Sequence, residues 1–481
     1  MKSRLSAPAD STLAAPRAEV LVIGPADPAD FMFQKLVDLM VEYGIHIESD
    51  SRDRLPLTPP RDLNGYKALV IDADSPAAKE VDAALARPGN AALRDRVVRY
   101  RKPKELSWHN ERPLWIWLNH LLLHRGVTPD NPAFLDRNAA RTDKDVILGQ
   151  AEACLREEPQ WCRRWCDSTL VRLEGIWSAA GFYGRREIRR TVLECVDDTL
   201  RVYADAPVYG KGETAGGLFK HPIFPGLLLP LWKETGIRRY RDAALGSMES
   251  LREARRIARE WRTGAPFLQT ESLDRKPWQW AMRAAWCGEP QFFQPAVDCM
   301  KAGYETLFDP RRMLWAHYGV RGKCCGLTWG RGQGWALYGL VGLLEHLPAE
   351  HPDRETLRSW LDQTAEGLRR AQDPESGMWR NVMGEPGTRL ETSGTAKCIR
   401  HFSRAWRLGL CRSDLLPDML ARAWRGLKAR TFAHRSCTRC YGTGPGADLS
   451  FYATLGAGGN YTACVQAGAE YVRAFGSGTR D

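Results

Sequence analysis

Hydrophobic positions recur at two different spacings along this chain of 481 residues, and the spacing changes near residue 145. Before that point, the short apolar runs "AEVLVIG", "IHIES" and "YKALVIDADS" are separated by polar stretches, and the segment "FMFQKLVDLMVEYG" has helical spacing and a terminal glycine. Short continuous apolar runs are typical of strands that are buried on both faces of a parallel sheet. The pattern therefore predicts a small α/β domain of flavodoxin-like topology over residues 19–105.

The two stretches that flank this domain have weaker patterns. Residues 1–18 are rich in Ala, Pro and Ser and predict a disordered leader, and residues 106–144 predict a helical linker. The domain contains neither GxGxxG nor GxxxxGK[ST], so the sequence gives nucleotide binding no support. A packing or interaction role is the simpler interpretation.

From residue 145 to the end, helix follows helix with little β-branched alternation. Five segments each begin with a turn and continue as an amphipathic helix, and each is preceded by another apolar helix. They are "YGRREIRRTVLECVDDTL", "TGIRRYRDAALGSMESL", "CGEPQFFQPAVDCMKAGYETL", "EHPDRETLRSWLDQTAEGL" and "CRSDLLPDMLARAWRGL". About six helical hairpins fit over residues 145–481, which predicts an (α/α)6 barrel whose inner helices surround a cavity. An open α-solenoid is the alternative, although such arrays usually keep a tighter period.

Composition and charge limit the cellular compartment and the binding partners that we expect for this protein. The formal net charge of +11 favours an acidic partner, but the basic residues are scattered as short pairs on helical segments, with no nucleic-acid-binding signature. No apolar run is long enough to span a membrane, and the N-terminus lacks the apolar core of a signal peptide. The thirteen cysteines form no regular framework. We therefore expect a cytoplasmic protein that binds neither nucleic acid nor membrane.

Five loops that precede predicted inner helices concentrate the residues suited to chemistry. The loops are "GGLFKHPIFPG", "QTESLDRKPWQW", "LWAHYGV", "WGRGQGW" and "RLETSGT". Carboxylates transfer protons, tryptophan rings stack on sugars, and arginine binds carboxylates in a bidentate geometry. This set points to an enzyme acting on an acidic carbohydrate. The cysteine pairs Cys324–Cys325 and Cys437–Cys440 have weak spacing for a zinc site, and we predict no metal.

The stretch "WGRGQGWALYGLVGLLEHLP", followed by "AQDPESGMWRNVM", "RLETSGTAKCIRHFSRAWRLGL" and "YGTGPG", resembles the unsaturated uronyl hydrolases of glycoside hydrolase families 105 and 88. The resemblance is collinear from about residue 303 to the end and weaker over residues 165–302. It implies an (α/α)6 barrel that removes a 4,5-unsaturated uronic acid from the non-reducing end of lyase-generated oligosaccharides. It also implies that a carboxyl group protonates the C4=C5 double bond and that water then adds at C5.

The resemblance assigns the candidate site residue by residue. Glu271 of "QTESLDR" occupies the position of the family's catalytic aspartate, and Asp274, three residues on, is the alternative proton donor. The implied substrate-binding residues come from the other loops, with Gln333 where the family has asparagine. They are His317, Trp329, Arg331, Gln333, Trp335, Thr392 and Ser393. Two further substrate-binding candidates rest on side-chain chemistry: His221, which can orient substrate or water, and Trp278 of the Glu271 loop, which can stack on a sugar ring.

One departure from the family keeps the function open. "KHPIFPG" contains His221 but no aspartate where the family has a second one. The alternatives to the uronyl hydrolase are therefore a glycosidase acting on saturated sugars, such as a glucuronidase, and a catalytically silent sugar-binding protein of the same fold. The expected partner is an acidic oligosaccharide, with no metal or organic cofactor. The oligomeric state stays open, and a homo-oligomer is among the alternatives.

Overall fold

The structure, a computed structural model, describes the following residues. They are 20–23, 47–50, 66–73, 76–87, 94–100, 135–136, 139–161, 166–203, 225–264, 267–273, 276–320, 323–431 and 461–476. No helix in this part of the chain is both long enough and apolar enough to cross a membrane. The chain divides into two compact units, residues 1–137 and 138–481.

The N-terminal unit contains a parallel sheet. Its strands are β1 (Val20–Ile23), β2 (Ile47–Asp50), β3 (Ala68–Asp72) and β4 (Val97–Tyr100), in the order β2-β1-β3-β4. Helix α2 (Pro76–Leu85) follows β3. Strands β1 and β3 fall within the apolar runs that predicted them, and β2 overlaps its run and extends one residue beyond it. Strand β3 is fully buried where its burial is described, from Ala68 to Ile71. The predicted helix at 31–44, the leader and most of the linker lie outside the described residues, and the flavodoxin-like domain stays a prediction.

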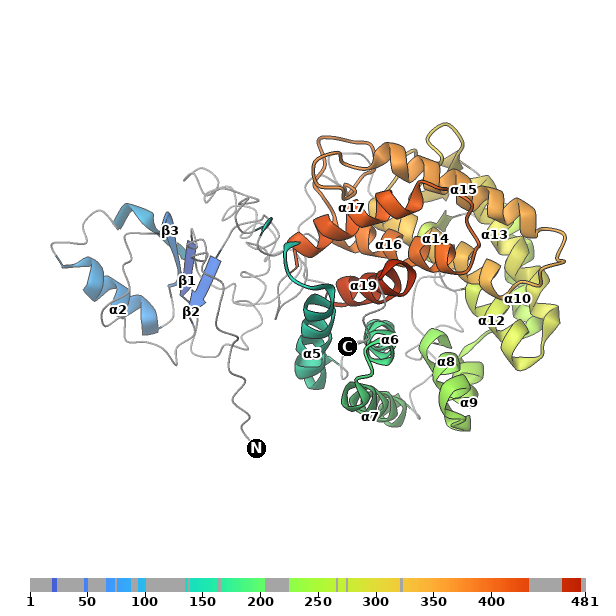
Figure 1. Ribbon diagram of the computed structural model, residues 1–481, viewed down its shortest axis with the longest axis horizontal. Coiled ribbons are helices and arrows are strands. Elements are labelled where there is room, and N and C mark those ends of the chain that lie inside the picture. Colours follow the sequence, from blue (N-terminus) through green and yellow to red (C-terminus); the bar gives the residue numbers. More distant parts are fainter. Residues whose placement is uncertain are drawn as a thin grey trace. The chain divides into compact units, whose positions relative to one another are not determined.

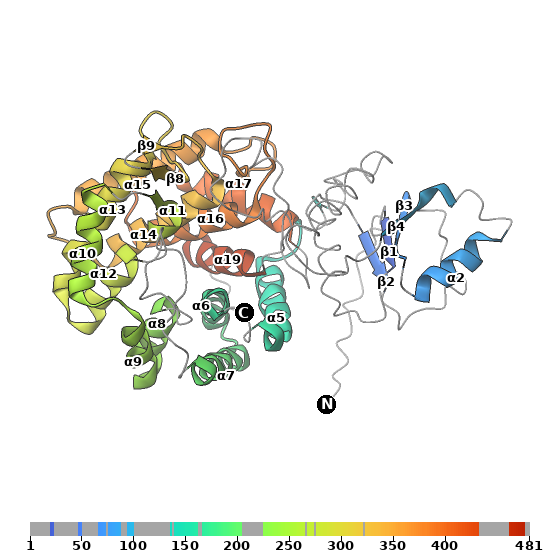
Figure 2. The same cartoon turned by 180° about the vertical axis from the view of Figure 1, so that it is seen from behind.

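The second unit is mainly helical, and its helices form two concentric layers (Figures 1 and 2). In the described chain the inner helices are α6 (Cys166–Phe182), α8 (Pro225–Thr235), α12 (Lys276–Cys287), α14 (Gly330–His346), α16 (Thr392–Arg407) and α19 (Tyr461–Phe475). Helix α19 packs against both α16 and α6, which brings the C-terminal helix back to the first inner helix and closes the ring. This arrangement is an (α/α)6 barrel.

The other long helices of the second unit form the outer layer. In the described chain these are α5 (Asp143–Trp161), α7 (Arg186–Tyr203), α9 (Arg238–Ser247), α10 (Leu251–Arg262), α13 (Phe293–Leu307), α15 (Arg354–Ala371) and α17 (Leu416–Ala429). The five turn-plus-helix segments of the sequence analysis correspond to α7, α9, α13, α15 and α17, so the predicted alternation of inner and outer helices is confirmed. Helix α10 begins with a capping box at Ser250 and Glu253 and adds a further outer helix to its hairpin.

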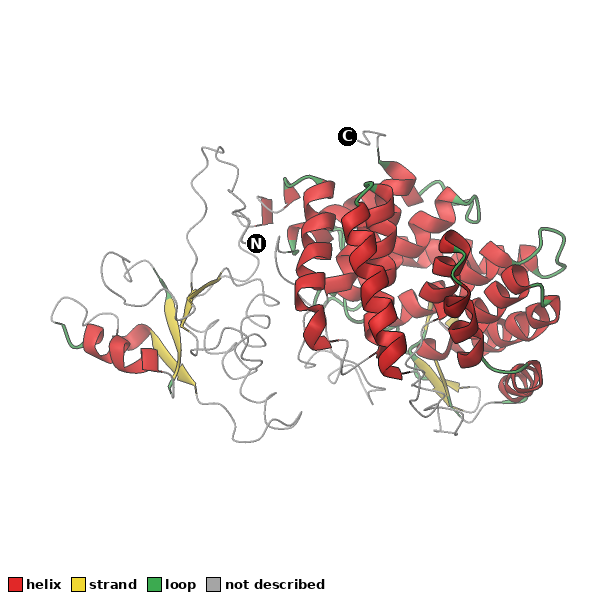
Figure 3. Ribbon diagram, turned by 90° about the horizontal axis from the view of Figure 1, so that it is seen from below, coloured by secondary structure: helices red, strands yellow, loops and turns green. Residues whose placement is uncertain are grey.

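Short strands gather toward one end of the barrel helices (Figure 3). Strands β5 (Leu268–Gln269), β8 (Tyr318–Val320) and β9 (Lys323–Cys324) form one antiparallel sheet, and β6 (Phe308–Asp309) pairs with β7 (Leu314–Trp315). The one-turn helix α11 (Thr270–Leu273) follows β5 directly. The sheets therefore fix the loops that lead into α12 and α14.

Glycines allow α14 to lie unusually close to its neighbours. A Cβ on Gly339 would come within 2.1 Å of the carbonyl oxygen of Leu273, and one on Gly342 would come within 2.1 Å of the Trp278 ring. Such distances exclude any side chain at these positions unless the helices move apart. The close packing of α11 and α12 on α14 therefore depends on glycine at these two positions of α14.

Candidate active site

Glu271 lies in α11, where the chain passes from the small sheet into the inner layer of helices. Its side chain is 16% exposed and accepts a hydrogen bond from the hydroxyl of Thr270 at 3.1 Å. The backbone N–H of Thr270 donates in turn to the carbonyl of His317 at 2.9 Å. The sheet pairing thus fixes the backbone beneath a carboxylate that keeps access to solvent.

His317 connects β7 to β8 and lies next to this carboxylate. Nε2 of His317 is 3.3 Å from Oε1 of Glu271, and the imidazole is completely buried. The backbone N–H of His317 donates to the carbonyl of Leu327 at 2.8 Å, which anchors the loop from the other side. With its proton on Nε2, the ring donates to Glu271 and orients the carboxylate.

Trp329 and Arg331 extend the same contact chain to the start of α14. The ring centroids of His317 and Trp329 are 4.4 Å apart, and the Arg331 guanidinium carbon lies 4.8 Å from the Trp329 ring centroid. The indole N–H of Trp329 donates to Oδ1 of Asn381 at 3.1 Å, which fixes the ring plane. A carboxylate, an imidazole, an indole and a guanidinium are therefore in successive contact.

Ser393 connects Arg331 to the start of α16. The guanidinium donates from Nη1 to the Ser393 hydroxyl at 3.2 Å, and that hydroxyl donates to the carboxylate of Glu391. Glu391 is the N-cap of α16 and also accepts from the backbone N–H groups of Ser393 and Gly394. A buried carboxylate at a helix N-terminus thus orients the cation through a hydroxyl.

Gln333 lies within this region but contacts the protein's own backbone. The side chain is fully buried; its Oε1 accepts from the Trp315 N–H at 2.8 Å, and its Nε2 donates to the Trp315 carbonyl at 2.5 Å. The amide therefore ties α14 to β7 in the manner of a strand partner. This gives Gln333 a bracing contact, whereas the resemblance implied substrate binding.

The glycines of "WGRGQGW" are occupied by close contacts between protein segments. A Cβ on Gly332 would lie 2.8 Å from the Thr270 hydroxyl, and one on Gly334 would lie 2.3 Å from Cβ of Lys397. The missing side chains bring the start of α14 against α11 on one side and α16 on the other. The motif thereby holds Trp329 and Arg331 beside Glu271.

Trp335 and Thr392 are the two remaining predicted residues at this end of the barrel, and they differ in exposure. Trp335 is half-buried, and the ammonium of Lys397 lies 3.4 Å from its ring centroid, so a cation covers one face of the indole. Thr392 is fully buried, and its hydroxyl has no hydrogen-bond partner in the structure.

One described residue of the prediction, Trp278, does not join this cluster. Trp278 lies on α12, where its ring meets Tyr338 edge-to-face at 4.6 Å, farther along the inner helices. His221 and Asp274 lie outside the described residues. Among the carboxylates proposed as proton donors, the structure therefore describes Glu271.

Sequence reasoning did not single out Thr270 or Lys397. Lys397 was open to detection because it follows Ser393 by four residues and therefore projects from the same side of α16. Thr270 carried no comparable signal, since its contact with residue 317 depends on the pairing of β5 with β8. Within the described part of the chain, no three His, Cys, Asp or Glu side chains cluster as metal ligands, and Cys437 and Cys440 lie outside it.

Comparison with known proteins gives a family match over the barrel. The model of Glycosyl Hydrolase Family 88 matches residues 226–475. A curated relative, the unsaturated rhamnogalacturonyl hydrolase YesR of Bacillus subtilis (strain 168), is 28% identical over 108 residues, which cover 22% of this chain and 31% of the relative. An unsaturated 3S-rhamnoglycuronyl hydrolase of Formosa agariphila is 28% identical over 103 residues, covering 21% and 27%. The matched segments thus span less than a third of these relatives.

Solved structures match over more of the chain. A family 105 glycoside hydrolase of C. acetobutylicum ATCC 824 covers 68% of this chain and 98% of its own, with 19% identity and a TM-score of 0.55. A glycosyl hydrolase of family 88 from Bacteroides vulgatus covers 70% and 100%, with 17% identity and a TM-score of 0.51. At these identities the likeness is one of fold.

Proposed function

Because the chain belongs to Glycosyl Hydrolase Family 88, we propose that it is a glycoside hydrolase that removes a 4,5-unsaturated uronic acid from the non-reducing end of lyase-generated oligosaccharides. The names of its curated relatives support this substrate class. The observation that carries the proposal is the contact chain Glu271–His317–Trp329–Arg331. It combines a proton donor, an orienting group and a cation that lies on a buried indole, all at one end of the barrel.

In the proposed binding mode, the uronate carboxylate lies against Arg331 and one face of the sugar ring lies near the Trp329 edge of the site. A guanidinium matches a carboxylate in charge and in planar geometry. The Ser393 hydroxyl and Glu391 hold the guanidinium in place, so binding requires little further ordering of Arg331.

In the proposed reaction, the carboxyl group of Glu271 gives its proton to C4 of the C4=C5 double bond, and positive charge develops at C5. A water molecule adds its oxygen to C5 and returns a proton to Glu271, which restores the carboxyl group. The resulting hemiketal opens to a ketone at C5 and leaves C1 as a hemiacetal, which collapses to an aldehyde and releases the next sugar as an alcohol. His317 holds the carboxyl group toward the ring throughout.

This mechanism differs from ordinary glycoside hydrolysis in using a single carboxyl group. Direct displacement at C1 uses a pair of carboxylates that flank the scissile bond. A hydration at C4=C5 needs one group to give and recover a proton. The proposed route therefore fits a site where, among the described residues, Glu271 is the carboxylate beside His317.

The test compares two substrates with the purified full-length chain. Unsaturated disaccharides from pectin, ulvan and glycosaminoglycan lyases should lose the absorbance of their conjugated double bond, while a saturated aryl glucuronide should release no aryl group. Turnover of the aryl glucuronide alone would favour a glycosidase of the ordinary type. Binding of the disaccharides without turnover would favour a silent sugar-binding protein.

A further inference from the structure

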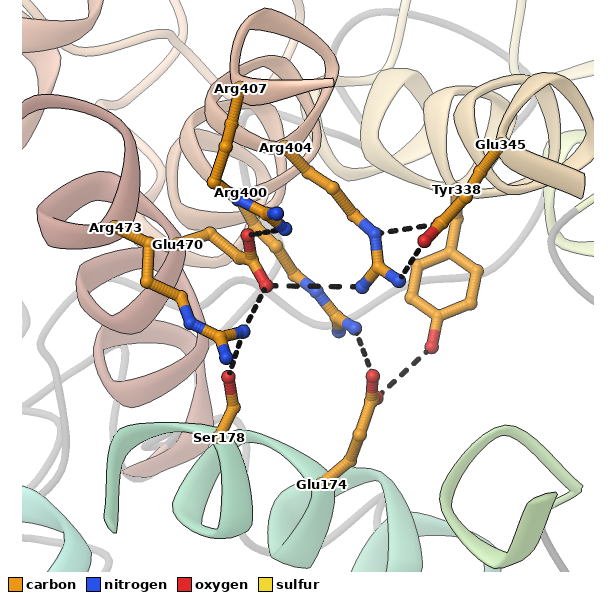
Figure 4. A network of polar contacts seen from close by, with 9 residues as sticks. All are labelled: Glu174, Ser178, Tyr338, Glu345, Arg400, Arg404, Arg407, Glu470 and Arg473. Carbon is orange, nitrogen blue, oxygen red and sulfur yellow. Dashed lines mark hydrogen bonds and ion pairs between the residues drawn. The ribbon is translucent and has the colours of Figure 1, made fainter. Parts of the chain in front are cut away.

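A second polar region lies inside the barrel, toward the C-terminal ends of α12, α14 and α16 (Figure 4). A cavity of about 420 Å³ opens there, separate from the residues around Glu271. Three indoles form part of its wall: Trp177, Trp278 and Trp286. Its ionisable lining consists of Glu174, Arg189, Glu234, His346, Arg400, Arg404, Glu470 and Arg473.

Most carboxylates around the cavity have several partners. Glu470 lies 3.0 Å from Arg407, 3.3 Å from Arg473 and 3.8 Å from Arg404. Glu345 accepts two hydrogen bonds from Arg404, both at 2.8 Å. Glu234 pairs with Arg189 and accepts from the indole N–H of Trp177 at 3.1 Å. These groups form closed ion pairs.

Arg400 is the exception. Its Nη2 donates to Glu174, which also accepts from the Tyr338 hydroxyl at 3.2 Å, and the guanidinium lies 4.8 Å from the Tyr338 ring centroid. Its Nη1 is buried and has no hydrogen-bond partner in the structure, although the whole residue is only 5% exposed. A buried charged donor without a partner is strongly unfavourable, so among the described residues the Arg400 guanidinium keeps unused hydrogen-bonding capacity beside this cavity.

The network also carries one more positive charge than negative charges. The residues of Figure 4 include four guanidinium groups, of Arg400, Arg404, Arg407 and Arg473, against three carboxylates, of Glu174, Glu345 and Glu470. Burial keeps two neighbouring imidazoles neutral: it lowers the pKa of His346 to about 4 and that of His401 well below its ordinary value. A single negative charge would balance the cluster.

We propose that this cavity binds a small sugar acid, whose one carboxylate accepts a hydrogen bond from the guanidinium of Arg400. The volume falls at the small end of the range for ligand pockets and suits a monosaccharide. The indole walls match the apolar face of a sugar ring, and the carboxylates of Glu174 and Glu234 are acceptors for its hydroxyls. The site is distinct from Glu271 and does not depend on the proposed reaction.

This assignment gives Trp278 a place that the sequence did not suggest. The sequence analysis predicted that this indole stacks on the substrate, and the structure places it on the wall of the second cavity, against Tyr338. Tyr338 contacts both the Trp278 ring and the Arg400 guanidinium. A ligand bound at Arg400 would therefore alter the surroundings of the Trp278 ring through Tyr338.

The first test is a crystal of the full-length chain soaked with D-glucuronate. The proposal predicts density for the sugar in the cavity, with its carboxylate within hydrogen-bond distance of a guanidinium nitrogen of Arg400. Ordered water alone at that atom, or glucuronate bound only beside Arg331, would overturn it. This experiment needs no variant and so does not depend on the folding of one.

The second test is calorimetry in the Arg331→Lys background, which weakens uronate binding at the other end of the barrel. Glucuronate should bind there with an affinity at least about tenfold higher than in the double variant that also carries Arg400→Lys, with folding checked by thermal melting. Equal affinities in the two proteins would contradict the role of Arg400. D-Glucose should give no heat, and inorganic phosphate should not displace glucuronate; binding of glucose as tightly as glucuronate, or displacement by phosphate, would refute a sugar-acid site.

Discussion

Oε1 of Glu271 lies 3.3 Å from Nε2 of His317, although the two residues are 46 positions apart in the sequence. The pairing of β5 with β8 brings them together, and the surrounding backbone hydrogen bonds hold both. A proton donor and the group that orients it are therefore fixed by the smallest sheet elements of a helical domain. The predictions below test this site, the packing around it and the buried charges beyond it.

Replacing His317 tests orientation of the carboxyl group. His317→Phe keeps a ring but removes the contact to Glu271, and kcat on an unsaturated disaccharide should fall about 10- to 100-fold, the value of one hydrogen bond to a charged group. His317→Gln restores a donor near the position of Nε2 and should recover several-fold of this loss. Equal kcat values for the two variants would show that His317 acts only through packing.

Replacing Arg331 tests recognition of the uronate. Arg331→Lys keeps the charge but loses the planar pair of donors and the Nη1 contact to Ser393, so KM should rise about tenfold while kcat changes less. Arg311→Lys, an exposed position in the β6–β7 turn, is the matched control and should leave both constants unchanged. A fall in kcat with an unaltered KM would place Arg331 outside substrate binding.

Two helical glycines test the packing of α14. Gly339→Ala would put a Cβ 2.1 Å from the carbonyl oxygen of Leu273, and we expect a loss of about 1–3 kcal/mol in the free energy of unfolding. Gly246→Ala, in α9, meets no atom within 4 Å and should stabilise by up to about 1 kcal/mol. Chemical denaturation of both variants measures the difference. Equal destabilisation by the two changes would contradict the close contact of α11 with α14.

His346 should make stability fall in mild acid. Burial, partly opposed by Glu345, lowers its pKa from 6.5 to about 4, so the unfolded chain takes up a proton before the folded chain does. Stability from this residue is complete above pH 6.5 and declines as the pH falls toward 4, by about 3 kcal/mol in total. His346→Phe keeps a ring against Trp286 and should remove this decline. Parallel pH curves for the variant and the unaltered protein would exclude the contribution.

Periodicity predicted the outer helices best. Helices such as α7 and α15 bury one face, so their apolar residues recur at helical spacing and their turns are marked by Gly or Pro. The inner helices are buried on more sides, so their apolar residues show a less regular spacing, and the short strands could not be predicted. Two-residue strands form because the chain pairs across long separations, which local spacing does not record.

The resemblance indicated which residues to consider for the candidate site, but it did not predict the contacts that each side chain makes. The resemblance named Glu271, His317, Trp329 and Arg331, and the structure places them in contact. It also named Gln333, whose side chain braces a strand. Trp278, predicted from the chemistry of its loop, lines a second cavity. A motif can be recognised in the sequence, but the partner of each side chain depends on which helices pack together.

The most direct measurement of the central claim is the rate at which the Glu271→Gln variant consumes the conjugated double bond of an unsaturated uronyl disaccharide. Glutamine has nearly the same shape as glutamate but cannot give and recover a proton, so the rate of absorbance loss should fall at least about 100-fold, with melting temperature preserved. Glu305→Gln, at an exposed position on α13, is the matched control and should retain the full rate. Full activity of Glu271→Gln beside an active unaltered protein would contradict the assignment of Glu271 as the proton donor.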